Sequence, residues 1–337
     1  METPFPAPPP PGQAVPVAPG IFWLRMPLPF ALDHVNLWLI EDGDGWAVID
    51  TGLPDRKTRE LWDEVLAGPM AGRAPARLVV THFHPDHMGL AAWLGRRFAL
   101  TMEATLAEWL YGRMLSLDPG DGFIEASRGF YRAAGFDEAL MTVMVERGNA
   151  YGKRVREIPP ALRRLRGGEE IRIGGHRWRV IVGRGHSPEH ACLWCEELQV
   201  LISGDQILPT ISPNVSVWPN EPEANPLQDF LDSLQVFRPL PADVLVLPSH
   251  GLPFRGLHAR LDALEQHHDE RLAKTLDACG TPLSALDVLR VLFRRELDTH
   301  QLFFALGESL SHLHCLLHQG KLRCETDTAG VRRFLRC

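Results

Sequence analysis

The stretch of sequence with the clearest chemistry is residues 82–87, which read H-x-H-x-D-H. In an extended segment His82 and His84 project to the same side, and a turn after them aims Asp86 and His87 at a neighbouring point. Neutral imidazole nitrogens and carboxylate oxygens suit zinc, and they also accept iron or manganese. The stretch therefore predicts a metal site whose geometry can serve two ions at once.

Two metal ions need more ligands than this stretch supplies, and three later positions offer them. His186, Asp205 and His250 each follow an apolar, strand-like run, and each is flanked by glycine or turn residues. Polar residues at such strand ends can converge on one edge of a sheet, where loops carry the chemistry. We therefore expect these three side chains to reach the same edge as residues 82–87.

Short β-type runs are the elements that must position these side chains. They occur within residues 21–50 and at 76–80, and the second of these delivers the metal-binding stretch at its C-terminal end. A second block of β-type runs covers 169–203 and 243–247. Helical segments lie between and outside the two blocks, which predicts an α/β protein with two facing sheets covered by helices.

Taken in order, these motifs and the Asp-Thr-Gly sequence at 50–52 resemble the five motifs of the metallo-β-lactamase superfamily, over residues 20–255. The resemblance implies an αββα sandwich with a two-metal site at one sheet edge. The catalytic domain would then carry a helical insertion at about 103–165. Asp50 would hold the geometry of the ligands, a role that neighbours of metal ligands commonly have.

The same resemblance implies a role for each ligand candidate. One ion would take His82, His84 and His186, the other would take Asp86, His87 and His250, and Asp205 would bridge both. By the same resemblance, Asp86 and Asp50 would be the catalytic carboxylates of this set. The expected cofactor is a pair of Zn²⁺ ions, with iron or manganese as alternatives.

True zinc β-lactamases carry other residues where His87 and Asp205 stand in this sequence. The chain resembles instead the hydrolytic branch that includes glyoxalase II-like thioesterases and lactonases. We expect a dinuclear zinc hydrolase in which a metal-bridging hydroxide attacks the carbonyl of a thioester, lactone or ester. The alternatives are a metal-dependent endoribonuclease or phosphodiesterase, iron-dependent persulfide or oxygen chemistry on the same scaffold, and an interaction scaffold without enzymatic activity.

Residues 103–165, in which we expect three helical segments, contain all three tyrosines of the chain, Tyr111, Tyr131 and Tyr151. One interpretation makes these tyrosines part of an apolar lid over the site, and the other makes them ordinary core-facing helix residues. An apolar, aromatic lid suits an acyl chain better than a phosphate backbone. The expected partner is therefore a small-molecule acyl substrate.

The two ends of the chain differ from the part between them. Residues 1–19 hold eight of the 28 prolines, so we expect a flexible or extended arm that joins no sheet.

Residues 256–337 predict three helices and a hairpin, the pattern of a winged-helix domain. The helix expected at 299–318 contains no Lys or Arg, which disfavours DNA binding, whereas the basic residues after it leave a weak RNA contact open. Its leucine row indicates a core or a homodimer contact.

Composition narrows the class of protein. The chain has 337 residues with 35 Lys+Arg against 42 Asp+Glu, and a net charge of −7 draws in neither nucleic acid nor an anionic membrane. No apolar run approaches the roughly 20 residues that span a bilayer, and no secretion signal is evident. The six cysteines then suit reduced thiols, and a cytoplasmic location is expected.

Overall fold

The computed structural model of the chain describes residues 1–30, 32–118 and 120–337. Its first sheet has seven strands in sequence order: β1 (Ala14–Ala18), β2 (Ile21–Pro27), β3 (His34–Asp42), β4 (Gly45–Ile49), β5 (Pro75–Val79), β6 (Met102–Ala104) and β7 (Leu162–Arg164). The second sheet has five strands in the order β12 (Leu245–Pro248), β11 (Val200–Gly204), β10 (His190–Cys195), β9 (His176–Gly183) and β8 (Glu170–Ile173). The predicted pair of sheets is confirmed.

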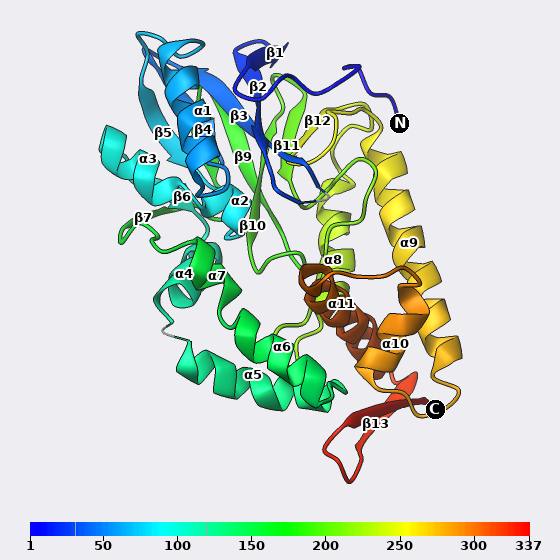
Figure 1. Ribbon diagram of the computed structural model, residues 1–337. Helices are drawn as coiled ribbons and strands as arrows, with labels where there is room; N and C mark the ends of the chain where they lie inside the picture. Colours follow the sequence, from blue (N-terminus) through cyan, green and yellow to red (C-terminus); the bar gives the residue numbers. More distant parts are fainter. Residues whose placement is uncertain (31, 119) are drawn as a thin grey trace.

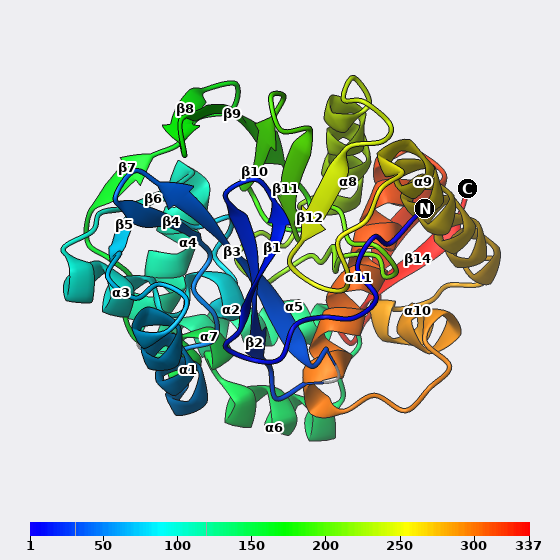
Figure 2. The same ribbon diagram turned by 90° about the horizontal axis from the view of Figure 1, so that it is seen from above.

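Helices cover the outer faces of both sheets (Figure 1, Figure 2). The first sheet carries α1 (Arg56–Ala67), α2 (Pro85–Met88) and α3 (Ala91–Phe98). The insertion between β6 and β7 contains α4 (Leu106–Leu117), α5 (Asp121–Ala133), α6 (Glu138–Arg147) and α7 (Ala150–Arg154). The second sheet is followed or covered by α8 (Pro226–Leu234), a 3₁₀ turn (Gln235–Phe237), α9 (Leu257–Ala278), α10 (Ala285–Leu292) and α11 (Thr299–His318).

Three clusters of buried apolar side chains define the layers. One cluster lies between the sheets and includes Trp38 of β3 and Trp178 of β9. A second joins the outer face of the first sheet to α1 through Trp62, and the third joins the second sheet to the C-terminal helices. Within β10, Cys192 faces the helices and Cys195 faces the other sheet, as strand alternation requires. This arrangement is the αββα sandwich.

The prediction that residues 1–19 join no sheet is wrong for 14–18. These residues form β1, which pairs antiparallel with β2 at the edge of the first sheet, and the register shifts between Pro16 and Ala18. A proline lacks an N–H but is tolerated on an edge strand or at a bulge, where no partner needs that donor. A further bridge joins Glu2 to Arg255.

Two other regions differ from the sequence prediction in detail. The insertion is not helical throughout, because its first and last residues form the short parallel strands β6 and β7. Strands of three residues are too short to show an alternating pattern. The C-terminal part has the expected three helices, followed by the hairpin of β13 (Leu322–Thr326) and β14 (Arg332–Arg336). Within the described ranges, none of the helices combines the length and apolar character needed to cross a bilayer.

Candidate metal centre

Residues 82–87 change from extended to helical conformation midway, and this change separates their side chains into two groups. The segment leaves the end of β5, and Pro85 opens the short helix α2 at a position where its missing N–H is no loss. His82 Nε2 and His84 Nδ1 approach to 2.9 Å in the extended part. Asp86 and His87 belong to α2 and form the second group, with 3.5 Å between Asp86 Oδ2 and His87 Nε2.

The second sheet completes both groups from its strand ends. His186, after β9, places its Nε2 3.2 Å from His82 Nε2. His250, after β12, places its Nε2 3.5 Å from Asp86 Oδ2. Two sets of side chains therefore have ligand atoms close enough to hold a metal ion: His82, His84, His186 and Asp205, and separately Asp86, His87 and His250.

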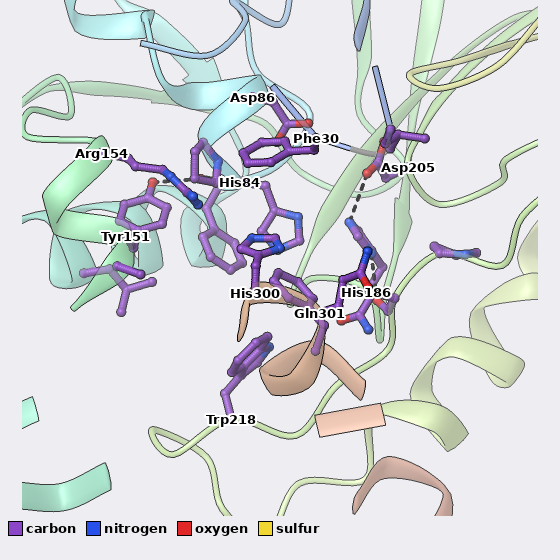
Figure 3. Close-up of a pocket in the computed structure, with 18 of the residues that line it drawn as sticks. Phe30, His84, Asp86, Tyr151, Arg154, His186, Asp205, Trp218, His300 and Gln301 are labelled. Carbon is purple, nitrogen blue, oxygen red and sulfur yellow. Dashed lines mark hydrogen bonds and ion pairs between the residues drawn. The ribbon is translucent and has the colours of Figure 1, made fainter. Parts of the chain in front are cut away.

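Asp205 lies between the two groups. Its Oδ2 is 3.5 Å from His186 Nε2, and its Oδ1 is 3.4 Å from His250 Nε2 and 3.6 Å from His87 Nε2. One carboxylate thus faces the first group with one oxygen and the second group with the other. Figure 3 shows Asp205 and His186 on one side of the cavity, with Asp86 and His84 across from them.

Hydrogen bonds to the far nitrogen fix the orientation of the imidazoles. His186 Nδ1 donates to the Asn214 carbonyl at 2.8 Å, and His250 Nδ1 donates to the His34 carbonyl at 2.8 Å. Because Nδ1 carries the proton in these rings, the Nε2 lone pair is free to face the cluster. Such tautomer control by a neighbour is typical of imidazoles that bind metal.

Asp50 performs the same task for the first sheet. Its carboxylate accepts from His87 Nδ1 at 2.9 Å, from the Thr81 hydroxyl at 2.8 Å and from the Thr81 N–H at 2.7 Å. The Thr81 hydroxyl in turn accepts a hydrogen bond from His82 Nδ1, with 3.0 Å between the two atoms. Asp50 has a φ of 65°, a left-handed conformation that costs a non-glycine residue energy and persists where surrounding contacts enforce it.

The residues of the cluster fit divalent cations by their donor chemistry. His87 Nε2 and Asp205 Oδ1 are buried atoms without a hydrogen-bond partner within the described part of the chain, and buried polar atoms rarely stay unpaired. Burial opposes ionisation of Asp205, yet His250 and His87 hold its pKa well below the usual value. Burial lowers the pKa of His84 to about 3. Ionised carboxylate and neutral imidazole are the states that metal binding requires.

The charges of the cluster show the same demand for a cation. Burial opposes protonation of His87, but Asp86 and Asp205 raise its pKa well above the ordinary value. The pKa of His250 is likewise raised by Asp205 against the effect of burial. The carboxylates therefore attract positive charge into a water-poor position, and a metal ion supplies that charge without a proton.

Two further residues contact the ligand-bearing segments, and Glu108 of α4 is the first. Its Oε2 accepts from the N–H of Phe83 at 2.9 Å, and its Oε1 accepts from the N–H of Glu189 at 2.7 Å. Phe83 lies between two ligands of the first sheet, and Glu189 follows a ligand of the second. The side chain is fully buried, and burial raises the pKa of Glu108 to about 7. Glu108 thus joins the two ligand-bearing loops, and no sequence signal marks it.

His190 is the second such residue. Its Nε2 accepts from the backbone N–H of Asp205 at 3.0 Å, and its ring stacks on His82 with 4.8 Å between centroids. Gly204 makes room for it, because a Cβ there would lie 2.3 Å from His190 Cε1. The nearness of His190 to the ligand candidate at 186 is the sequence signal that indicates it.

A cavity of about 600 Å³ opens over the cluster (Figure 3). Tyr111, Tyr131 and Tyr151 all line it, so the structure places the three tyrosines of the insertion at one cavity. Tyr151 donates to the carbonyl of Phe83 at 2.7 Å, and the ring of Tyr111 lies 5.4 Å from that of Phe83. The remaining walls are mainly apolar and aromatic, which suits a ligand with an apolar body.

The loop on the far side of the cavity is tied to the C-terminal helices by a chain of hydrogen bonds, which we call the histidine relay. His312 Nδ1 donates to the Glu308 carbonyl at 2.8 Å, so its Nε2 accepts from His268 Nδ1 at 3.4 Å. His268 Nε2 then accepts from the hydroxyl of Ser212, a cavity residue, at 3.1 Å. Burial lowers the pKa of His312 to about 4, which keeps the relay neutral.

Comparison with solved structures supports the fold over the whole chain. A beta-lactamase domain protein from Burkholderia ambifaria is 43% identical with a TM-score of 0.92, and the match covers 100% of this chain and 98% of that one. A metallo-beta-lactamase family protein from Thermus thermophilus is 30% identical with a TM-score of 0.79, over 95% of this chain and 99% of that one.

Relatives whose names state an enzymatic activity have lower sequence identity to this chain. A probable metallo-hydrolase from Bacillus subtilis is 24% identical over 308 residues, which are 87% of this chain and 91% of that protein. A human acyl-coenzyme A thioesterase is 28% identical over 194 residues, which are 56% of this chain and 63% of that protein. These matches support a metallo-hydrolase without fixing the substrate or the branch of the superfamily.

Family models divide the chain in two. A model described as the metallo-beta-lactamase-like C-terminal domain matches residues 272–337, and because this description names no winged helix, that class stays a prediction. A model of the metallo-beta-lactamase superfamily matches residues 31–250, which contain every candidate ligand described above. The chain therefore belongs to the metallo-beta-lactamase superfamily.

Proposed function

We propose that the protein is a dinuclear metal-dependent hydrolase, with zinc as the first expectation, that cleaves acyl thioesters. The observation that carries this proposal is the position of Asp205, whose two oxygens face two separate groups of ligand atoms at the base of a mainly apolar cavity. One group alone would serve a single ion. A carboxylate shared between two groups is the arrangement that a bridged pair of ions requires.

The ligand roles follow from the two groups. His82, His84 and His186 would hold one ion, Asp86, His87 and His250 would hold the other, and Asp205 would contact both. When bound, a pair of divalent ions supplies a water nucleophile that is deprotonated near neutral pH and a Lewis acid for the carbonyl oxygen. Iron or manganese would use the same donor set.

The chain's own residues supply charge, orientation and a dry cavity. Asp86 and Asp205 offset part of the positive charge, and Asp50 holds His87 by its Nδ1. The cavity walls place Phe83, Tyr111 and Tyr151 above the ligands, where they exclude water and contact an acyl chain. Exclusion of water strengthens every electrostatic contact that the cluster makes with a polar carbonyl.

Thioesters are the favoured electrophile among the esters and lactones that the site would accept. The human relative is named an acyl-coenzyme A thioesterase, and another, from Aspergillus fumigatus, is named an atrochrysone carboxyl ACP thioesterase. The apolar cavity agrees with an acyl chain as the part of the substrate that is buried. We therefore place the thioester carbonyl at the cluster and the acyl chain along the aromatic wall.

The test uses purified protein, metal analysis and a neutral thioester, butyryl-N-acetylcysteamine, with thiol release as the readout. We expect two equivalents of metal per chain and a loss of kcat/KM on the order of 1,000-fold or more in Asp205→Asn. Asp243→Asn, an exposed substitution, is the control. Absence of thiol release from protein that holds two metal equivalents, or full activity in Asp205→Asn, would refute the proposal.

A further inference from the structure

The cavity wall contributed by the insertion carries two arginines at helix ends. Arg147 is the last residue of α6, and its guanidinium carbon lies 4.5 Å from the ring centroid of Phe303. Arg154 is the last residue of α7, and its guanidinium carbon lies 5.1 Å from the ring centroid of Phe30. Both arginines line the cavity that opens over the metal-ligand cluster. Figure 3 shows Arg154, Tyr151 and Phe30 around the same space as His84.

Neither guanidinium has a carboxylate partner among the residues that the structure describes. Arg147 is largely buried, and burial lowers its pKa, with the neighbouring charge of Arg154 acting in the same direction. The carboxylates of the cavity are engaged elsewhere: Asp298 accepts from the N–H of Gln301 at 2.8 Å, and the others belong to the metal-ligand cluster. A cation–π contact with phenylalanine offsets only part of the cost of partly removing the Arg147 cation from water, whereas Arg154 is exposed.

Stabilisation of the C-terminus of α6 does not account for Arg147. A cation near a helix C-terminus is favourable in general. At the end of α6, however, Lys153 already performs this role, because its Nζ donates to the carbonyls of Glu146 and Arg147 at 2.9 and 2.7 Å. Arg147 is therefore free to present its guanidinium to the cavity. The net charge of −7 also means that the molecule as a whole does not attract anions, so a preference for an anion must be local.

We propose that Arg147 and Arg154 form a subsite for an anionic group, a carboxylate or a phosphate, that the substrate carries into the cavity. This inference rests on the proposed function, because it names the substrate class of the same site. The planar guanidinium presents paired N–H donors that match both anions. The guanidinium of Arg147 lies over the ring of Phe303, and that of Arg154 lies over the ring of Phe30. The substrate is then an acyl thioester with a negative charge away from the carbonyl.

The negative charge can come from either end of a thioester. A dicarboxylic acyl group carries a carboxylate at the far end of its chain, whereas a phosphopantetheine thiol carries a phosphate on the leaving group. A matched set of four thioesters separates these sources: butyryl or glutaryl as the acyl group, each on N-acetylcysteamine or on 4′-phosphopantetheine. The butyryl N-acetylcysteamine ester is the neutral reference.

The measured quantity is kcat/KM for each charged thioester relative to the neutral reference. We expect one charged arm to exceed the reference by about 10- to 100-fold in the wild type, and the arm that does so identifies the source. In Arg147→Gln and Arg154→Gln this ratio should fall towards one through a rise in KM, and Arg147→Lys should restore part of it. Arg156→Gln, an exposed arginine of the same segment that lies outside the cavity lining, should keep the ratio.

The outcomes separate this inference from the proposed function. Efficient cleavage of the neutral thioester without preference for either charged arm would overturn the subsite alone, as would a ratio that survives in both glutamine variants. If no thioester is cleaved, the proposed function fails, and calorimetric binding of glutarate and of 4′-phosphopantetheine decides the subsite by itself. Binding of neither anion, or equal binding by wild type and Arg147→Gln, would then overturn it.

Discussion

The two walls of the cavity are built in opposite ways. The wall that carries the metal-ligand cluster consists of strand ends whose side chains are buried and joined by short hydrogen bonds, as between Asp50 and His87. The facing wall consists of helix ends and loops, and it relies on ring contacts such as Phe30 against His300, with centroids 5.3 Å apart. Polar networks fix one geometry, whereas apolar and aromatic contacts tolerate exchange of similar volumes.

This contrast assigns chemistry to one wall and specificity to the other. A change in the ligand wall should alter metal binding or folding, because each buried polar group depends on its partner. A change in the apolar and aromatic lining of the facing wall should alter which substrates bind, with less effect on folding than a change in the ligand wall. Single substitutions with matched controls test that division.

Asp50→Asn should give the largest effect, because it changes a hydrogen-bonded residue of the ligand wall itself. The amide replaces one carboxylate oxygen with an NH₂ group, which would face either the Thr81 N–H or both His87 Nδ1 and the Thr81 hydroxyl, all of which donate to Asp50 in the native protein. Metal affinity, measured by competition with a chelator, should fall on the order of 10- to 100-fold. Asp55→Asn, which keeps the N-cap of α1, is the control. Unchanged affinity would show that Asp50 does not orient the ligands.

The histidine relay should make stability depend on pH even in protein stripped of metal. The folded pKa of His312, about 4, lies below the ordinary value near 6.5, and burial lowers that of His268 as well. The stability contribution is therefore complete above about pH 6.5 and is lost as the pH falls towards 4. For one histidine the loss is at most about 3 kcal/mol.

Urea unfolding at pH 7, 6 and 5 measures this dependence. His312→Gln should flatten it, whereas the exposed His318→Gln should leave it as in the wild type. If both variants and the wild type show the same slope, the relay histidines do not titrate with unfolding.

Glu108→Gln should weaken the connection between the two ligand-bearing loops. At pH 8 the native carboxylate, with a pKa of about 7, is ionised and accepts from two backbone N–H groups. A glutamine leaves one of those donors without an acceptor, at a cost of about 2 kcal/mol in the free energy of unfolding. Glu125→Gln removes only an exposed ion pair on α5 and should cost less than about 0.5 kcal/mol. Equal stabilities would contradict the role assigned to Glu108.

Tyr151→Phe and Tyr131→Phe give the smallest effects and separate two tyrosines of the cavity. The hydroxyl of Tyr151 donates to the Phe83 carbonyl, so its loss should cost about 1 kcal/mol in unfolding free energy. Tyr131 packs by its ring against Phe136 and Phe303, and its hydroxyl should be dispensable within about 0.5 kcal/mol. A larger cost for Tyr131→Phe would reverse this assignment.

The ligand wall could be predicted from sequence because its residues lie in one short motif and at the ends of recognisable strands. Asp86 and His87 stand within that motif, and Asp205 follows an apolar run. Glu108 could not be found in this way, since its partners are backbone N–H groups, which leave no trace in the sequence. The facing wall was accessible only as three tyrosines, because Arg154 meets Phe30 through a contact between distant segments.

The proline-rich segment before β2 has a consequence for handling the protein. Its strand β1 occupies the edge of the seven-stranded sheet, and Pro16 there offers no N–H to an incoming chain. Removal of residues 1–19 would leave β2 as the unpaired edge strand of the sheet. Its apolar Ile-Phe-Trp-Leu sequence would then be available to pair with a second molecule. We therefore expect a truncated form to self-associate.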